Sequence, residues 1–337
     1  MSLKTIAFTT GDPGECHYHL WPAKQPDQQS DQQSDHQQAP AKAWIHIMHG
    51  MAEHSARYQH LAEFLNQQGY MVSADDHRGH GKTGAANGNL YHFADNNGWN
   101  QMIDDQWQLI EHIGQQTDLP LIIIGHSMGS FMATRFCQIY AERLSNKLQN
   151  RPGNKLGESL KGLVLSGSNY APPWICRAAA GIARIERLRL GRDASSNLME
   201  SLSFGAFNNA FKPNRTSKDW ISSNPDVVDT YLADPHCGGA ISTQSWYDFL
   251  NGLAELGSPK AMAKINAELP IYLFSGALDP VGGQGKGVEK LADILEAAGV
   301  VNIDCKLYPK GRHEMLNETN KLEVYGDLLG WLDSRVG

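Results

Sequence analysis

The chain has 337 residues and 41% hydrophobic content, enough to bury a full α/β core with a further segment left over. Its net charge of −7 at pH 7 argues against binding to nucleic acid, because lysine and arginine are not in excess. The five cysteines are scattered and form no C-x-x-C pair, so we expect no disulfide framework and no zinc site. We also expect no cofactor and a reducing, cytoplasmic location. Neither a secretory signal nor an apolar run of the ~20 residues that span a bilayer is visible.

Two short strands are predicted at the start of the chain, over residues 4–10 and 17–21, around a turn rich in glycine and proline. Residues 24–42 are rich in Gln, Asp and Ser, and almost no apolar side chain is available for burial. Such a segment cannot offset the entropy lost on ordering, so we predict a mobile surface insert there. A strand over 43–49 and a helix over 57–68 follow, and Gly69 caps that helix.

The next strand, residues 70–74, runs into a loop with two aspartates and two histidines, which are Asp75, Asp76, His77 and His80. These side chains resemble a metal cluster in composition. The glycines between them indicate a tight loop, however, and no helix supplies a matching pair of ligands. We therefore predict no metal site in this loop. A helix over 99–116 leads to the following strand.

Four apolar residues, 121–124, run directly into a Gly-x-Ser-x-Gly motif at residues 125–129, and a helix-like pattern follows. An entirely apolar run of this length indicates a strand buried on both faces of a parallel sheet. Gly-x-Ser-x-Gly between a strand and a helix is the nucleophile elbow, a sharp turn that exposes the serine hydroxyl. A Cβ at Gly125 or Gly129 would collide with neighbouring backbone. The pattern therefore predicts Ser127 as a nucleophile.

After a strand over 162–166, the alternation of strands and helices stops. Residues 169–261 are too many for a simple connection, so we predict an inserted helical cap there. The α/β core would then comprise residues 1–168 and 262–337, with a mostly parallel sheet flanked by helices.

The first helix of the predicted cap, ending near residue 188, has an apolar and a basic face. The apolar face holds Trp174, Ala178, Ile182 and Ile185, and the basic face holds Arg177, Arg184 and Arg187. A solvated face explains the arginines, and so does peripheral contact with an anionic lipid surface. The large apolar residues of the cap either line an acyl tunnel or pack its own core; they are Trp174, Ile182, Ile185, Phe204, Phe207 and Phe211.

Two further polar residues follow strands near the end of the chain. Asp279 comes shortly after a strand over 270–275, and His313 after a strand over 302–308. A serine hydroxyl needs an adjacent base, and that base needs a carboxylate to orient it. Loops at the carboxyl ends of the strands supply such groups in an open α/β sheet. The chain order Ser127, Asp279, His313 is the one expected of α/β hydrolases.

Acyl transfer also requires hydrogen-bond donors for the developing oxyanion. One is the backbone N–H of Met128, directly after the nucleophile. The second is expected in the loop after the strand over 43–49, where Met51 lies. The polar residues just beyond it, among them Glu53 and Arg57, either have a structural role or face a substrate head group.

These motifs together resemble the monoacylglycerol lipase and lysophospholipase group of serine hydrolases. The resemblance rests on a His-Gly-x-x-Glu-His block at 49–54, an Asp-His-Arg-Gly-His-Gly block at 76–81, the elbow, and the loops around Asp279 and His313. It covers nearly the whole chain except residues 24–42 and much of the cap. It implies an α/β-hydrolase fold, an oxyanion hole formed by Met51 and Met128, and a polar substrate end near Glu53, Arg57 and His126.

We therefore predict a serine carboxylic-ester hydrolase that forms an acyl-enzyme, with a monoacylglycerol or lysophospholipid as its small-molecule substrate. An aminopeptidase or small-ester hydrolase of the same fold is an alternative. An aminopeptidase would need a cap carboxylate to hold a substrate amine, and Glu186, Glu200 and Asp193 are available. A non-catalytic ligand-binding protein would be favoured by loss of a triad residue, but all three are present. The oligomeric state does not follow from the sequence.

Overall fold

The computed structural model describes residues 2–8, 13–23, 41–149 and 160–336, so most of the predicted insert at 24–42 lies outside the described residues. The described residues form an eight-stranded sheet with the order β1-β2-β4-β3-β5-β6-β7-β8. The strands are β1 (Ser2–Phe8), β2 (Gly14–Trp21), β3 (Trp44–Met48), β4 (Met71–Asp75), β5 (Leu121–His126), β6 (Leu160–Ser166), β7 (Ile271–Gly276) and β8 (Ile303–Tyr308). The pairs β1–β2 and β2–β4 are antiparallel, and the remaining pairs are parallel. The predicted α/β fold with a mostly parallel sheet is confirmed.

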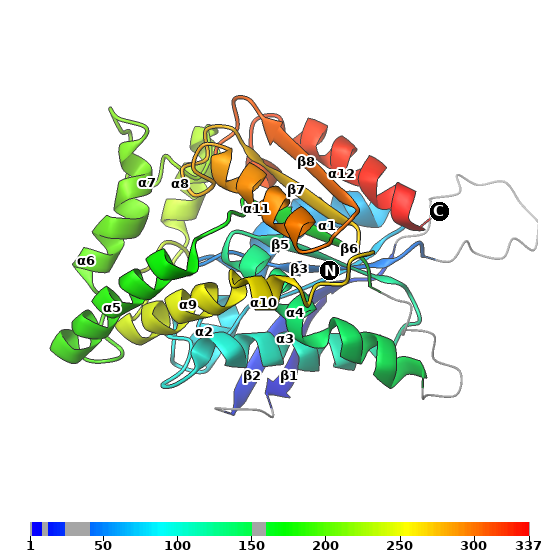
Figure 1. Cartoon of the computed structure of the whole chain (residues 1–337), viewed down its shortest axis with the longest axis horizontal. Helices are drawn as coiled ribbons and strands as arrows, with labels where there is room; N and C mark the ends of the chain where they lie inside the picture. Colours follow the sequence, from blue (N-terminus) through cyan, green and yellow to red (C-terminus); the bar gives the residue numbers. More distant parts are fainter. Residues whose placement is uncertain (1, 9–12, 24–40, 150–159, 337) are drawn as a thin grey trace, which may run out of the picture.

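Helices cover both faces of the sheet (Figure 1). One face packs against α3 (Gly98–Gly114), α4 (Met128–Gln149) and α11 (Lys286–Ala297), and the other against α1 (Gln59–Gln67) and α12 (Lys321–Val336). The short elements are η1 (Ser55–Tyr58), α2 (Gly81–Ala86) and η4 (Met315–Asn317). Strand β5 is buried on both sides, because Leu121 and Ile123 enter one core and Ile122 and Ile124 enter the other. This double burial explains why its sequence is an uninterrupted apolar run.

A group of helices separates β6 from β7, and α5, α6, α7 and α8 of this group lie to the left of the sheet in Figure 1. Its elements are α5 (Pro173–Leu190), α6 (Asn197–Glu200), the π-helical turn η3 (Ser201–Gly205), α7 (Ala206–Asn209), α8 (Pro225–Ala233), α9 (Thr243–Leu256) and α10 (Pro259–Met262). We call this group the cap. Its boundaries at 169 and 261 stay a prediction. In the described part of the chain, no helix combines the length and the apolar character needed to cross a bilayer.

Helix α5 shows a different buried face from the one expected. The small residues Cys176, Ala180 and Ala183 are buried, and α5 packs closely along α9. Trp174 and Ile185 are instead 71% and 64% exposed. Small side chains allow two helices to approach closely, which leaves the bulky residues outside.

Packing in the core of the cap is therefore wrong for Trp174 and Ile185, whereas the idea that these two residues and Ile182 line a tunnel stays a prediction. The phenylalanines of the cap agree with the second alternative, packing in the core of the cap. Phe204, Phe207 and Phe211 are partly buried against a small core that includes Trp220.

Candidate active site

Ser127 occupies a strained turn between β5 and α4. Its φ of +52° lies in the left-handed region, and its N–H donates to the carbonyl of Ser166 at 2.9 Å. A Cβ on Gly125 would lie 2.6 Å from the Cα of Ser130, and one on Gly129 would lie 2.5 Å from the carbonyl oxygen of His49. Both distances are far below van der Waals contact, which is the reason predicted for these two glycines. The side chain of Ser127 is partly exposed at the carboxyl end of the sheet.

His313 and Asp279 form a buried pair in the loops after β8 and β7. The Nδ1 of His313 lies 2.9 Å from the Oδ2 of Asp279. The carboxylate also accepts hydrogen bonds from the Ser275 hydroxyl and the Val281 N–H, both at 2.9 Å. Burial alone would lower the pKa of His313, but the charge and hydrogen bond of Asp279, together with the charges of Glu314 and Glu53, outweigh burial and raise that pKa above its usual value. The Nε2 of His313 is buried and has no hydrogen-bond partner in the described residues.

The loops that carry Ser127 and His313 meet around two glycines. A Cβ placed on Gly50 would lie 3.2 Å from the Cβ of Ser127 and 3.4 Å from the ring of His126. A Cβ on Gly167 would lie 3.0 Å from the ring of His313 and 3.1 Å from that of His126. The rings of His126 and His313 are 4.8 Å apart. The fold thus gathers the predicted nucleophile and base in one place, and their catalytic roles stay a prediction.

The predicted oxyanion donors flank Ser127. Met128 is the first residue of α4, and the first N–H groups of a helix have no acceptor in the preceding turn. Met51 lies in the loop after β3, where the Gly50 N–H donates to Glu53 Oε1 at 2.5 Å. Among the described residues, no acceptor forms a hydrogen bond with the N–H of Met51. Both N–H groups are therefore available for an oxyanion, although that role is untested.

Glu53 and Arg57 belong to a buried network behind this loop. Arg57 donates to Glu53 at 2.5 Å and to both oxygens of Glu314 at 2.8 and 2.7 Å. The Tyr58 hydroxyl also donates to Glu53, at 2.8 Å. Burial would raise the pKa of Glu314, but the charge of Arg57 lowers it to about 2. The charge of Arg57 is thus balanced within the protein, and its contact with a head group stays a prediction.

His126 lies between this network and His313. Burial and the neighbouring His313 lower the pKa of His126 to about 4, so its ring is neutral at pH 7. Its Nδ1 is 3.2 Å from the hydroxyl of Ser166. Its predicted place near the polar end of the substrate is untested.

The cap contacts the loop of His313 directly, which sequence reasoning missed. The ring of Trp220 lies 5.0 Å from that of His313, and the Glu314 N–H donates to the carbonyl of Ile221 at 2.7 Å. Trp220 follows an aspartate in an irregular segment between α7 and α8, where no periodicity marks it. The only sequence signal for Glu314 was its position next to His313.

Within the described residues, two groups of side chains are close enough to share a metal ion. One group is His54, Asp234 and Cys237, and the other is His92, Asp95 and Asp193. In the first group, His54 Nε2 is already 2.9 Å from Asp234. Neither group contains a residue of the loop at 75–83. A metal-free mechanism stays a prediction.

Known proteins resemble this chain over most of its length. The model of the family described as "Serine aminopeptidase, S33" matches residues 39–320. The chain belongs to this S33 family. It is 26% identical over 291 residues to a monoacylglycerol lipase of Mycolicibacterium smegmatis. This alignment covers 86% of this chain and 88% of that protein. It is also 24% identical over 307 residues to the monoglyceride lipase of Homo sapiens. This alignment covers 88% of this chain and 84% of the human protein.

The fold of a solved esterase is also similar to that of this chain. A thermostable carboxyl esterase from Bacillus coagulans, in complex with glycerol, aligns over 100% of both chains with a TM-score of 0.83 and 25% identity. The resemblance to the monoacylglycerol lipase group is thereby confirmed. The protein is an ester hydrolase with the α/β-hydrolase fold.

Proposed function

We propose that this protein hydrolyses a single-chain lipid ester, a monoacylglycerol or a lysophospholipid, through an acyl-enzyme on Ser127. The observation that carries the proposal is the 2.9 Å pairing of His313 Nδ1 with the buried Asp279. This pairing fixes the imidazole and leaves its Nε2 to act as a base. The names of the relatives from Mycolicibacterium smegmatis and Homo sapiens support monoacylglycerols over other esters.

In the proposed reaction, His313 accepts the proton of Ser127 as the serine oxygen attacks the ester carbonyl. The N–H groups of Met51 and Met128 bind the oxyanion of the tetrahedral intermediate. His313 then donates the proton to the departing alcohol. Water, activated by the same imidazole, hydrolyses the acyl-enzyme and releases the fatty acid.

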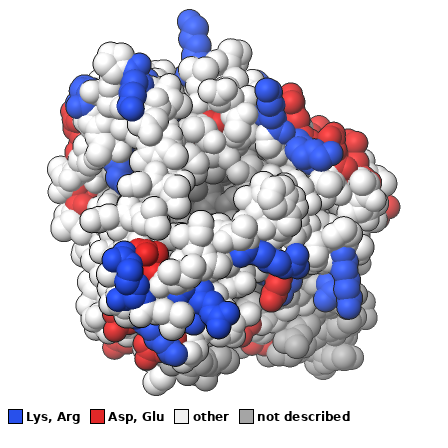
Figure 2. All heavy atoms as spheres, turned by 60° about the vertical axis from the view of Figure 1, so that its left-hand side comes forward, with Lys and Arg blue, Asp and Glu red and all other residues white. Residues whose placement is uncertain are grey.

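The surroundings of the site support an apolar acyl chain. Figure 2 shows a hollow in the face of the molecule on the cap side, bordered mostly by residues that are neither acidic nor basic. Within the cap, Phe204 stacks on Trp220 with ring centroids 5.7 Å apart, and Trp220 contacts His313. We assign the acyl chain to these aromatic rings. We assign the alcohol to the side of Glu53, Arg57 and His126, where polar atoms are concentrated.

The test is a set of kcat/KM values on one preparation for a medium-chain monoacylglycerol, a lysophospholipid, a triacylglycerol and an aminoacyl amide. The first two should be hydrolysed fastest. Ser127→Ala should lower kcat by at least about a thousandfold, because triad removal costs orders of magnitude in serine hydrolases. The exposed cap serine Ser201 offers a matched control, since Ser201→Ala should leave kcat unchanged. Activity that survives in Ser127→Ala would refute the nucleophile.

An aminopeptidase is a second candidate, supported by the description of the S33 family. Of the three cap acids considered from the sequence, Glu186 is paired with Arg189 and Ser196, and the side chain of Asp193 is 81% exposed. Glu200 has a buried oxygen without a hydrogen-bond partner, and burial raises its pKa. A substrate amine would therefore bind at Glu200. Faster hydrolysis of the aminoacyl amide than of the esters, abolished in Glu200→Gln, would establish this alternative.

We also propose peripheral membrane contact through α5 and a cytoplasmic location. The exposed Trp174, Ile185 and Leu188 on α5, next to the exposed Arg177 and Arg184, support contact with anionic lipid. The cysteines of the chain are all unpaired, which supports a reducing compartment. The Ile185→Ser variant should cosediment with anionic vesicles less than the wild-type protein does. Equal binding by the wild-type protein and the variant would exclude α5 as the contact.

A further inference from the structure

The loop that carries Met51 is held by a buried histidine, His49. Its Nδ1 lies 2.7 Å from the carbonyl oxygen of Gly50, and its Nε2 accepts the backbone N–H of His77 at 3.0 Å. Because a carbonyl oxygen only accepts, the proton of the His49 ring is on Nδ1. Burial and the neighbouring His77 keep the pKa of His49 well below its usual value, so this ring is neutral.

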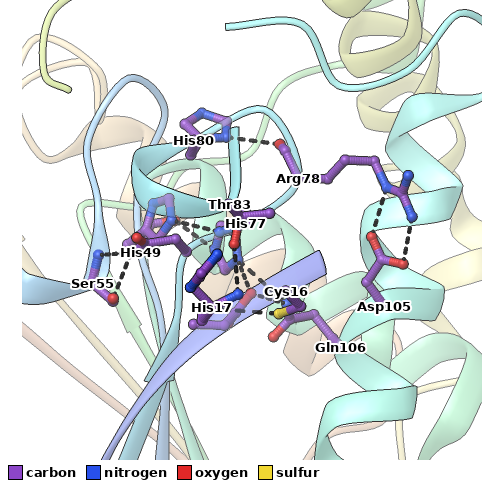
Figure 3. A network of polar contacts seen from close by, with 12 residues as sticks. Cys16, His17, His49, Ser55, His77, Arg78, His80, Thr83, Asp105 and Gln106 are labelled. Carbon is purple, nitrogen blue, oxygen red and sulfur yellow. Dashed lines mark hydrogen bonds and ion pairs between the residues drawn. The ribbon is translucent and has the colours of Figure 1, made fainter. Parts of the chain in front are cut away.

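The ring of His77 has an acceptor at each nitrogen (Figure 3). Its Nδ1 is 2.9 Å from Asp75 Oδ2, and its Nε2 is 3.2 Å from the carbonyl oxygen of His49. The Gln106 amide nitrogen also lies 3.3 Å from Nδ1, but it donates to Asp75 at the shorter distance of 2.9 Å. The ring of His77 therefore links the carboxylate of Asp75 to the backbone of the loop that carries Met51.

Asp75 is suited to accept a hydrogen bond from His77. Burial alone would raise its pKa, but His77 and the hydrogen bond from Gln106 lower it. The rings of His77 and His49 stack with centroids 3.8 Å apart and 18° between their planes. The ring of His77 thus lies flat on the ring of His49 and limits its rotation.

These hydrogen bonds hold the two peptide groups that come directly before Met51, those between His49 and Gly50 and between Gly50 and Met51. In the first, the carbonyl of His49 accepts from His77 and the N–H of Gly50 donates to Glu53. In the second, the carbonyl of Gly50 accepts from His49 Nδ1, and the N–H belongs to Met51. A hydrogen bond to a carbonyl polarises its peptide group and strengthens the N–H as a donor.

We propose that Asp75, His77 and His49 form a hydrogen-bonded relay that orients and polarises the N–H of Met51 for oxyanion binding. His49 and His77 are positioning residues, because they act through the peptide and do not touch the substrate. The inference rests on the proposed function, in which Met51 is an oxyanion donor. It adds a support, anchored on the buried carboxylate of Asp75, that the triad and the oxyanion hole alone do not contain.

The first test compares wild-type protein with His77→Gln and Asp75→Asn on a medium-chain monoacylglycerol. Removal of a whole oxyanion donor costs about 10²–10³ in kcat, so a weakened donor should cost about 10- to 100-fold. The KM should change little, because the relay acts on the transition state. An alkyl boronic acid, which forms a tetrahedral adduct on serine, should lose affinity by a similar factor. A non-hydrolysable alkyl glycerol ether should bind unchanged.

His60 provides a control for lost stability. It is a partly buried histidine on α1 with its Nε2 3.2 Å from the carbonyl oxygen of Leu316 and its ring against Tyr325, so its contacts lie away from Asp75, His77 and His49. His60→Gln should lower the melting temperature but retain kcat. Equal losses of kcat in both variants, or a kcat in His77→Gln within about threefold of wild type, would overturn the relay.

A spectroscopic test does not depend on activity. Nitrogen-15 NMR, assigned by comparison with His49→Gln, should show the ring of His49 protonated on Nδ1 and unprotonated on Nε2 at pH 8. The opposite tautomer of His49 would overturn the relay. Failure of the proposed function would differ from both results, because wild-type protein itself would then hydrolyse no ester.

Discussion

The ring of Trp220 lies 5.0 Å from the ring of His313, inclined by 40°. Trp220 belongs to the cap, and His313 follows the strand β8 of the sheet. The backbone supports the same contact, since the N–H of His313 lies 3.4 Å from the carbonyl of Trp220. The cap therefore forms part of the surroundings of the proposed catalytic base.

Trp220→Ala should lower kcat/KM at least about tenfold, because the His313 ring loses a packing partner, and should destabilise the protein by about 3–5 kcal/mol. Trp220→Phe keeps an aromatic ring and should recover most of the activity. Kinetics at a temperature where both variants are folded will separate the two effects. If Trp220→Ala retained wild-type kcat/KM, the cap contact would have no part in holding His313.

The activity should rise with pH as His313 loses its proton, since only a neutral imidazole can accept the serine proton. The pKa of His313 is raised by Asp279, so the midpoint of kcat/KM should lie above the ordinary histidine value of about 6.5. Asp279→Asn removes that charge and should move the midpoint down while lowering kcat. A pH profile of both proteins checks this, and an unmoved midpoint would exclude His313 as the titrating base.

Glu314 should stabilise the fold in a pH-dependent way. Its pKa is lowered to about 2 by Arg57, so the stabilisation is present above the unfolded-state pKa and is lost as the pH falls toward about 2. Glu314→Gln leaves Arg57 with one carboxylate fewer and should cost about 3–5 kcal/mol at pH 7, with a smaller cost at pH 3. Urea unfolding at both pH values measures this.

Glu289→Gln is the control for Glu314→Gln, because Glu289 is an exposed glutamate on α11. Its effect should be within about 0.5 kcal/mol at either pH. A loss in Glu314→Gln that is the same at pH 7 and pH 3 would show that packing, and not charge, explains it.

Strong chelators should leave kcat unchanged, because the proposed mechanism uses only Ser127, His313 and Asp279. Dialysis against a chelator, followed by assay with and without added zinc, provides the measurement. A loss of activity that zinc restores would point to His54, Asp234 and Cys237, whose ligand atoms lie within 4.8 Å of one another. In that case His54→Ala should reproduce the effect of the chelator.

The sequence by itself determined the sheet and the places of the proposed catalytic side chains. A strand buried on both faces is an apolar run, and the turn after it needs glycines at fixed positions, so β5 and the elbow of Ser127 were visible locally. Asp279 and His313 follow recognisable strands, and parallel strands bring their carboxyl ends to one edge. Each of these signals is contained in a few consecutive residues.

Only the tertiary structure decided how the cap contacts the edge of the sheet where Ser127, Asp279 and His313 lie. Trp220, at a place without periodicity, contacts a histidine that is distant in the chain. The choice of buried face on α5 depended on α9, because small residues permit the closest packing whatever the amphipathic pattern suggests. Likewise, Arg57 became a paired, buried charge because Glu314 arrives from the far end of the chain. Contacts between distant segments leave no local pattern in the sequence, so they appear only when the chain is folded.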